Sequence, residues 1–112
     1  MSENTSRKRR GWPYWGIENG QRSLFIPLTL LGKLSPSHVL LFAAMAAEGD
    51  AARWTTVDEA ALGKESGQKP TAVARDLAKL QKKGLVELRW VENSPEYRIT
   101  ARGEALILGL AS

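Results

Sequence analysis

The chain has 112 residues, of which 43% are apolar and 25% are charged, and its net charge is +4 at pH 7. This length and composition suit one globular domain. With no cysteine and a single histidine, His38, the chain lacks disulfides, thiolate metal sites and a multi-histidine metal or catalytic site. We therefore expect a protein that is not an enzyme and binds no metal or cofactor.

No segment has the length of a transmembrane helix. The longest uninterrupted apolar run, residues 39–47, has nine residues, whereas a bilayer span needs about 20. The basic N-terminus is followed by Gly11-Trp12-Pro13 and further turn residues rather than by an apolar secretory segment. We expect a cytoplasmic protein that has no membrane partner.

Residues 1–10 are polar, lack periodicity and contain one acid, Glu3. The sequence predicts that they form a disordered arm. Two roles remain open for it, a solubilising tail or an arm that contacts DNA phosphates or a minor groove. The cations that would make those contacts are Arg7, Lys8, Arg9 and Arg10.

Residues 11–34 form an aromatic N-terminal extension. Trp12, Tyr14 and Trp15 stand among glycine and proline residues, which favours packing on the domain or on a dimer partner over a base-stacking platform. Residues 24–28 are expected to form a short strand or an extended segment, limited to a sheet edge by Pro27.

The first helix is predicted to begin after Ser35. Ser35 is a good N-cap, Pro36 suits the first helical position, and the apolar run ends near Gly49. Because this helix is apolar nearly all round, it should be central and could be shared with a partner subunit. His38 in its first turn is expected to face solvent or to cap the helix.

Two shorter helices follow. Thr56 and Glu59 have capping-box spacing and predict the start of the first. Gly67 marks a tight turn, Pro70 begins the second helix and Gly84 ends it.

The second of these helices is strongly amphipathic. Val73, Leu77 and Leu80 share one side, and residues 64–83 hold six cations and two acids. A small, polar, cationic outer face has the shape and charge to lie in a DNA major groove. The residues expected on that face are Thr71, Arg75, Ala78, Lys79 and Lys82.

A hairpin and a last helix complete the chain. Residues 85–91 alternate as a strand, with Val86, Leu88 and Trp90 on one face. Residues 92–95 form a turn, and residues 96–100 return as a strand with Tyr97 and Ile99 inward. A short strand near Trp54 is expected to pair with this hairpin, and Thr100 is expected to cap a helix from residue 101 to about residue 110.

This order of elements is that of a winged helix-turn-helix domain. The segment TAVARDLAKLQKKGLVEL, residues 71–88, resembles the recognition helix and first wing strand of that family. The segment YRITARGEALI, residues 97–107, is similar to the Tyr-x-Leu-Thr-x-x-Gly ending of bacterial regulators of the multiple-antibiotic-resistance (MarR) type. The resemblance covers about residues 35–110. It implies an α+β, mostly helical fold in residues 35–112, a winged helix-turn-helix with a two-stranded β-hairpin wing.

The resemblance and the charge pattern imply a DNA-binding transcriptional regulator, most simply a repressor. It would bind a pseudo-palindromic site in double-stranded DNA as a homodimer. Residues 25–46, FIPLTLLGKLSPSHVLLFAAMA, also resemble the beginning of winged-helix domains in plasmid and phage replication initiators, which gives a second DNA-binding function. A winged-helix adaptor that binds another protein is the third alternative.

The predicted contacts divide by position. In the recognition helix, Arg75 can present a bidentate fork to guanine, while Lys79 and Lys82 suit phosphates. The other residues expected at base edges are Gln68, Lys69, Thr71 and Ala72. On the wing, the expected contact residues are Arg89, Asn93, Ser94 and Arg98.

Overall fold

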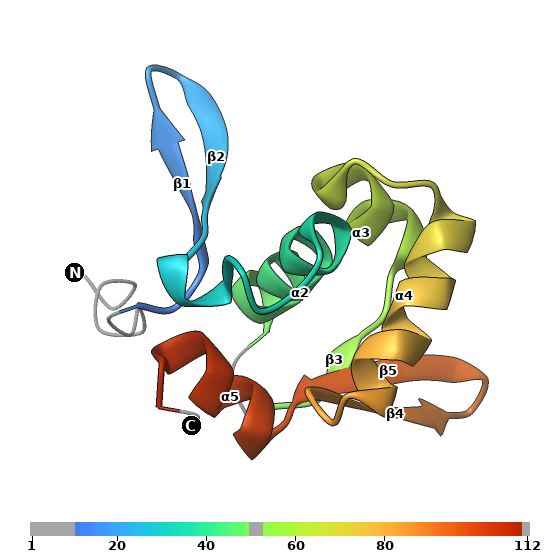
Figure 1. Cartoon of the computed structure of the whole chain (residues 1–112). Helices are drawn as coiled ribbons and strands as arrows, with labels where there is room; N and C mark the ends of the chain where they lie inside the picture. Colours follow the sequence, from blue (N-terminus) through green and yellow to red (C-terminus); the bar gives the residue numbers. More distant parts are fainter. Residues whose placement is uncertain (1–10, 50–52, 111–112) are drawn as a thin grey trace.

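The computed structural model describes residues 11–49 and 53–110. In these ranges the chain forms helices and two small antiparallel sheets, which confirms the predicted α+β class (Figure 1). The elements are β1 (Tyr14–Glu18), β2 (Gln21–Phe25), the 3-10 helix η1 (Leu28–Leu30), α2 (Pro36–Glu48), β3 (Thr55–Thr56), α3 (Glu59–Ser66), α4 (Pro70–Lys82), β4 (Val86–Val91), β5 (Ser94–Ile99) and α5 (Ala101–Leu108).

Helix α2 is the centre of the fold. Its residues 41–46 are fully buried, and α3, α4 and β1 pack around it. The predicted start is confirmed, because Ser35 takes the N-cap position and Pro36 the first helical position. The helix ends at Glu48, with Gly49 as its C-cap. An almost wholly apolar helix is therefore enclosed by the rest of the domain, as its composition predicts.

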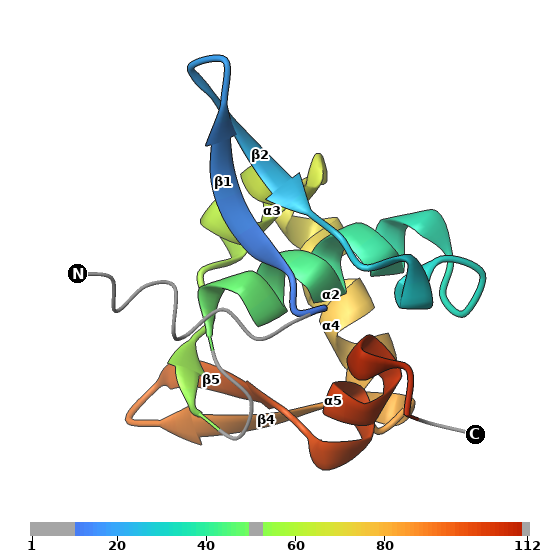
Figure 2. The same cartoon turned by 90° about the vertical axis from the view of Figure 1, so that its left-hand side faces the viewer.

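The N-terminal extension forms a hairpin that projects from the body (Figures 1 and 2). The expected short strand at residues 24–28 is instead β2, which ends at Phe25 and pairs with β1. Asn19 and Gly20 make the connecting turn with φ angles of 53° and 78°, the two-residue geometry that Asn-Gly favours. Below the hairpin, Trp12 is 6% exposed and its Nε1 donates to the Ala46 carbonyl at 2.9 Å, so the extension packs on α2.

Helix α3 begins later than predicted. The Asp58 carboxylate accepts a hydrogen bond from the Ala61 amide at 3.0 Å and caps the helix. The capping-box prediction for Thr56 is wrong, because Thr55 and Thr56 pair with β5 as strand β3. The short strand expected near Trp54 to pair with the hairpin is confirmed, one residue later in the chain.

The turn between α3 and α4 is tight for two reasons. Gly67 ends α3 with φ +73°, a conformation that favours glycine. Gly63 lies inside α3, where an added Cβ would lie 2.5 Å from the Gln68 carbonyl oxygen. The turn backbone therefore crosses α3 at a distance that only glycine permits, which fixes where α4 begins.

The C-terminal sheet has the strand order β3-β5-β4. Its hairpin turn is shorter than predicted, because Ser94 and Pro95 belong to β5 and only Glu92 and Asn93 connect the strands. The Thr100 hydroxyl accepts a hydrogen bond from the Gly103 amide at 3.0 Å, which confirms the predicted cap of α5. This helix ends at Leu108 rather than near residue 110.

Candidate nucleic-acid interface

Helix α4 buries the side that the sequence predicts. Val73 and Leu80 are fully buried and Leu77 is 4% exposed. Pro70 opens the helix at its first position, also as predicted. The orientation of α4 about its own axis is therefore the expected one, with the opposite side in solvent.

A buried acid lies within the same stripe. Asp76 is only 2% exposed, and its Oδ2 accepts a hydrogen bond from Gln68 Nε2 at 2.8 Å. Its Oδ1 is 3.3 Å from His38 Nε2, and the Ser66 hydroxyl donates to Gln68 Oε1 at 3.0 Å. These four side chains, the Asp76 network, join α2, the end of α3, the turn and α4.

The expectation that His38 faces solvent or caps α2 is wrong. The ring is 8% exposed and lies against Asp76. Since Asp76 belongs to α4, which packs on α2, a polar side chain at this point of α2 meets a partner across the helix interface.

The Asp76 carboxylate is ionised at neutral pH. Burial by itself raises its pKa, but the hydrogen bonds from Gln68 and His38 and the electrostatic interactions with His38 and Arg75 outweigh burial. The result is a pKa below the ordinary value of 3.8. The only acid of α4 is thus a buried anion with partners on several sides, not a surface charge.

The solvent face of α4 carries cations and, between them, short side chains. Short side chains, Thr71, Ala74 and Ala78, lie on it and are exposed. No acid of α4 reaches this surface, because Asp76 is buried. The exposed cations of the helix and its two ends are Lys69, Arg75, Lys79, Lys82 and Lys83.

The structure brings most of the predicted helix residues to this one surface. Lys69, Thr71, Arg75, Lys79 and Lys82 are all exposed, and Ala72 is half-buried. The Arg75 side chain is 63% exposed, although its Nε lies 3.5 Å from Asp76 Oδ1.

Gln68 stands apart from the other predicted base contacts. Both ends of its amide take part in the Asp76 network, and the residue is only half-exposed. Its place is therefore that of a support for α4, and a base contact would require it to leave Asp76.

The predicted wing arginines have partners within the hairpin. Arg89 Nε donates to Glu96 Oε1 at 2.8 Å, and Arg98 donates to Glu87 on the neighbouring strand. Both guanidinium groups lie over the Trp54 ring, at 4.1 and 4.8 Å from its centroid. This face of the hairpin is electrically balanced, and a phosphate would compete with two carboxylates for the arginines.

The remaining predicted residues fall at the hairpin tip and in the N-terminal arm. Asn93 and Ser94 are exposed at the tip. The arm, with Arg7, Lys8, Arg9 and Arg10, lies outside the described residues.

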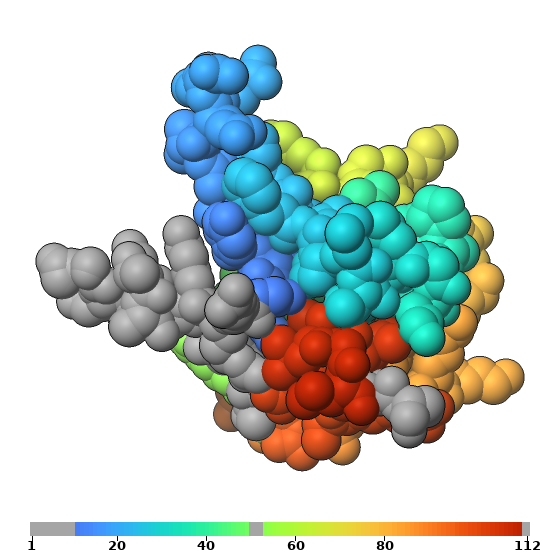
Figure 3. Space-filling model, turned by 60° about the vertical axis from the view of Figure 1, so that its left-hand side comes forward, coloured from blue at the N-terminus to red at the C-terminus, as the bar shows by residue number. Residues whose placement is uncertain are grey.

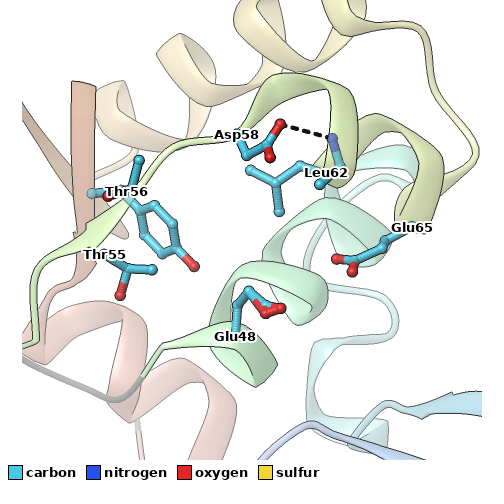
Figure 4. Close-up of a pocket in the computed structure, with 8 residues that line it drawn as sticks. Glu48, Thr55, Thr56, Asp58, Leu62 and Glu65 are labelled. Carbon is cyan, nitrogen blue, oxygen red and sulfur yellow. Dashed lines mark hydrogen bonds between the residues drawn. The ribbon is translucent and has the colours of Figure 1, made fainter. Parts of the chain in front are cut away.

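A cavity of about 270 Å³ lies away from this surface, where α2, β3 and α3 meet (Figure 4). Glu48 and Glu65 extend toward the same space, and Asp58 at its edge is turned to the start of α3. Burial, followed by the charge of Glu48, raises the pKa of Glu65, although Arg22 at 3.6 Å lowers it in part. A cavity lined by carboxylates disfavours an anionic ligand. The cavity and the cationic face of α4 therefore differ in the charge of the ligand that each could accept.

Among the described residues, no group of three or more acidic, histidine or cysteine side chains is placed to hold a metal ion. In the same residues, every helix is too short or too polar to cross a bilayer. Comparisons of the chain with protein-family models, curated proteins and solved structures found no match. The argument for function therefore rests on the surface of α4 and its surroundings.

Sequence reasoning missed the Asp76 network, although one signal was present. Asp76 stands three residues after Val73 and one before Leu77, at a position that belongs to the buried stripe. An acid at such a position needs a buried partner. The identity of that partner, His38, depends on how α2 packs against α4.

We expect Asp76→Asn to lower the free energy of unfolding at pH 7 by about 1–3 kcal/mol, because it places a neutral amide against His38 and Arg75. Since the folded-state pKa of Asp76 is lowered, its charge contributes stability above pH 3.8, and this contribution is lost as the pH falls through the folded-state pKa. Urea denaturation at pH 7 and pH 3 should therefore show a difference that shrinks in acid. Glu92→Gln at the exposed hairpin tip is the matched control, and equal stability of the two variants at pH 7 would contradict the assignment.

Proposed function

We propose that the chain is a cytoplasmic, sequence-specific transcriptional regulator that binds double-stranded DNA. In this proposal the domain is a winged helix-turn-helix in which α3 and α4 form the helix-turn-helix, α4 is the recognition helix, and β4 and β5 are the wing. The observation that carries it is the exposed face of α4, where five cations surround short side chains and the only acid of the helix is buried.

The composition of that face suits a duplex groove. An α-helix fits the major groove when its outer side chains are short enough for the backbone to approach the bases. Thr71, Ala74 and Ala78 meet this condition along the middle of the helix. Arg75 stands between them with a side chain long enough to reach a guanine edge, while Lys79 and Lys82 lie farther along and suit phosphates.

The position of the hairpin supports the same function. In Figure 1 the β4–β5 hairpin extends past α4 on the right of the view, away from α2, against which α4 packs. A helix in the major groove would therefore bring the hairpin tip, with Asn93 and Ser94, to the flanking backbone or minor groove. Arg89 and Arg98 would contribute only by exchanging Glu96 and Glu87 for phosphate.

A homodimer completes the proposal, since one reading head of this size buries only about 600–1,000 Å² on DNA. Leu28 and Leu31 are 80% and 56% exposed, and Leu110 is 73% exposed. The η1 segment holds Leu28 and is followed directly by Leu31. It lies beside α5 on one face, where Thr29 donates to the Ile107 carbonyl (Figure 3). We assign this face, the leucine face, to the dimer contact.

The first test is duplex binding itself. A fluorescence-polarisation titration with random-sequence duplex at 50 and 200 mM salt should give a log–log slope of about −4 to −8, because about that many phosphates lose counterions. Lys79→Ala with Lys82→Ala should make the slope shallower. A flat slope, or no binding at low salt, would favour an adaptor that binds another protein.

The second test concerns specificity and uses duplexes selected from a random pool. Arg75→Ala should remove most of the preference for the selected site over random duplex, since one bidentate guanine contact discriminates by about 1–3 kcal/mol. Weak, salt-sensitive binding should remain. Lys33→Ala, an exposed cation outside α4, is the control. Full site preference in the Arg75 variant would place a different residue at the bases.

The third test concerns assembly. Multi-angle light scattering should give the mass of a dimer at tens of micromolar, and Leu28→Lys with Leu31→Lys should give a monomer that keeps its melting temperature. Val91→Lys, which charges an apolar residue at the hairpin tip, should leave the dimer intact. A monomeric wild-type chain would contradict the dimer, and a dimeric double variant would exclude the leucine face.

A further inference from the structure

The hairpin tip exposes a large aromatic side chain that the charge pattern does not explain. Trp90 is 71% exposed, while Trp12 is buried and Trp15 and Trp54 are half-buried. An indole in solvent forgoes the burial that stabilises most tryptophans. The exposed ring is therefore available for a contact outside the chain.

Strand alternation places Trp90 on the helix side of the hairpin. Val86 is buried and Leu88 half-buried on the same face of β4, where the strand packs on α4. Trp90 continues this row beyond the edge of the core, opposite Pro95 on β5. The indole consequently lies on the same side of the hairpin as α4, toward its tip.

The other face of the hairpin is already occupied. Arg89 and Arg98 are paired with carboxylates there and cover the Trp54 ring. The helix side of the tip thus offers an apolar ring, while the adjacent α4 offers cations without exposed acids. An apolar contact next to a cationic surface complements a duplex, whose anionic backbone borders stacked bases and deoxyribose rings.

We propose that Trp90 contacts DNA directly: its indole packs against deoxyribose and base edges of the minor groove that flanks the major groove occupied by α4. This inference rests on the proposed function. Because the contact is apolar, it adds affinity that salt does not screen, in contrast to Lys79 and Lys82. It also favours steps that unstack easily, such as TA and CA, at the flank of the site.

The experiment compares Trp90→Ala with Trp90→Phe and Ile17→Ala. Ile17 is a matched control, since it is 73% exposed at the other hairpin. All variants are titrated against the same random duplex at 50 and 200 mM salt, with melting temperatures as a check on folding. Trp90→Ala should weaken binding about tenfold at both salt concentrations with an unchanged salt slope. Trp90→Phe should keep most of the affinity, and Ile17→Ala should bind as the wild type does.

Tryptophan fluorescence provides a second measurement. Duplex should quench the emission of the wild-type chain, and Trp90→Phe should lose most of that quenching because the remaining three indoles are buried or half-buried. If the wild-type chain binds duplex, and Trp90→Ala and Ile17→Ala bind it with equal affinity, this inference is overturned while the proposed function stands. Loss of the dimer in Trp90→Ala would also overturn it, since the indole would then be a protein contact. Absence of duplex binding by the wild-type chain would overturn the proposed function as well.

Discussion

The buried charge of Asp76 is the constraint on which the exposed surface depends. The carboxylate can be buried as an anion because Gln68 and His38 are its partners, and its burial without them would be costly. Successive helical residues differ in direction by about 100°. Asp76 shares the buried side of α4 with Val73 and Leu77, and Arg75 lies on the exposed side. The polar interaction thus keeps the one acid of α4 away from the cations that the helix presents to solvent.

The same network links the position of α4 to the turn before it. Gln68 is the first residue after Gly67, and its carbonyl lies against Gly63 at a distance that excludes a Cβ. The Gln68 side chain meanwhile bridges Ser66 and Asp76. Gln68 is thus held in place both by its backbone, which lies against Gly63, and by its side chain, which bonds to Ser66 and Asp76. A shift of the turn would lose both contacts, which relates the start of α4 to the end of α3.

Local sequence signals accounted for the elements that bury a periodic face. Helix α4 and strands β4 and β5 followed from alternation or helical spacing, and Thr100 was identified as a cap. The N-terminal hairpin was missed although Asn19-Gly20 is a strong turn signal, because the flanking aromatics and glycines lack clear alternation. The Thr56 cap failed because the residue was needed in a strand pair whose other member, Glu96, lies forty residues away. Pairings of this kind depend on tertiary contacts that a single sequence leaves open.

The candidate interface has two parts, the β4–β5 hairpin and α4, and charge is divided unevenly between them. This division favours DNA over a protein partner. On the hairpin, Arg89 and Arg98 are neutralised by acids directly across the strands. On α4, no exposed acid opposes the cations. A protein–protein surface gains specificity from interspersed charges of both signs and is depleted in lysine at its core. A lysine-rich helix with short side chains between the cations suits a partner of uniform negative charge whose groove admits the backbone closely, and a duplex has both properties.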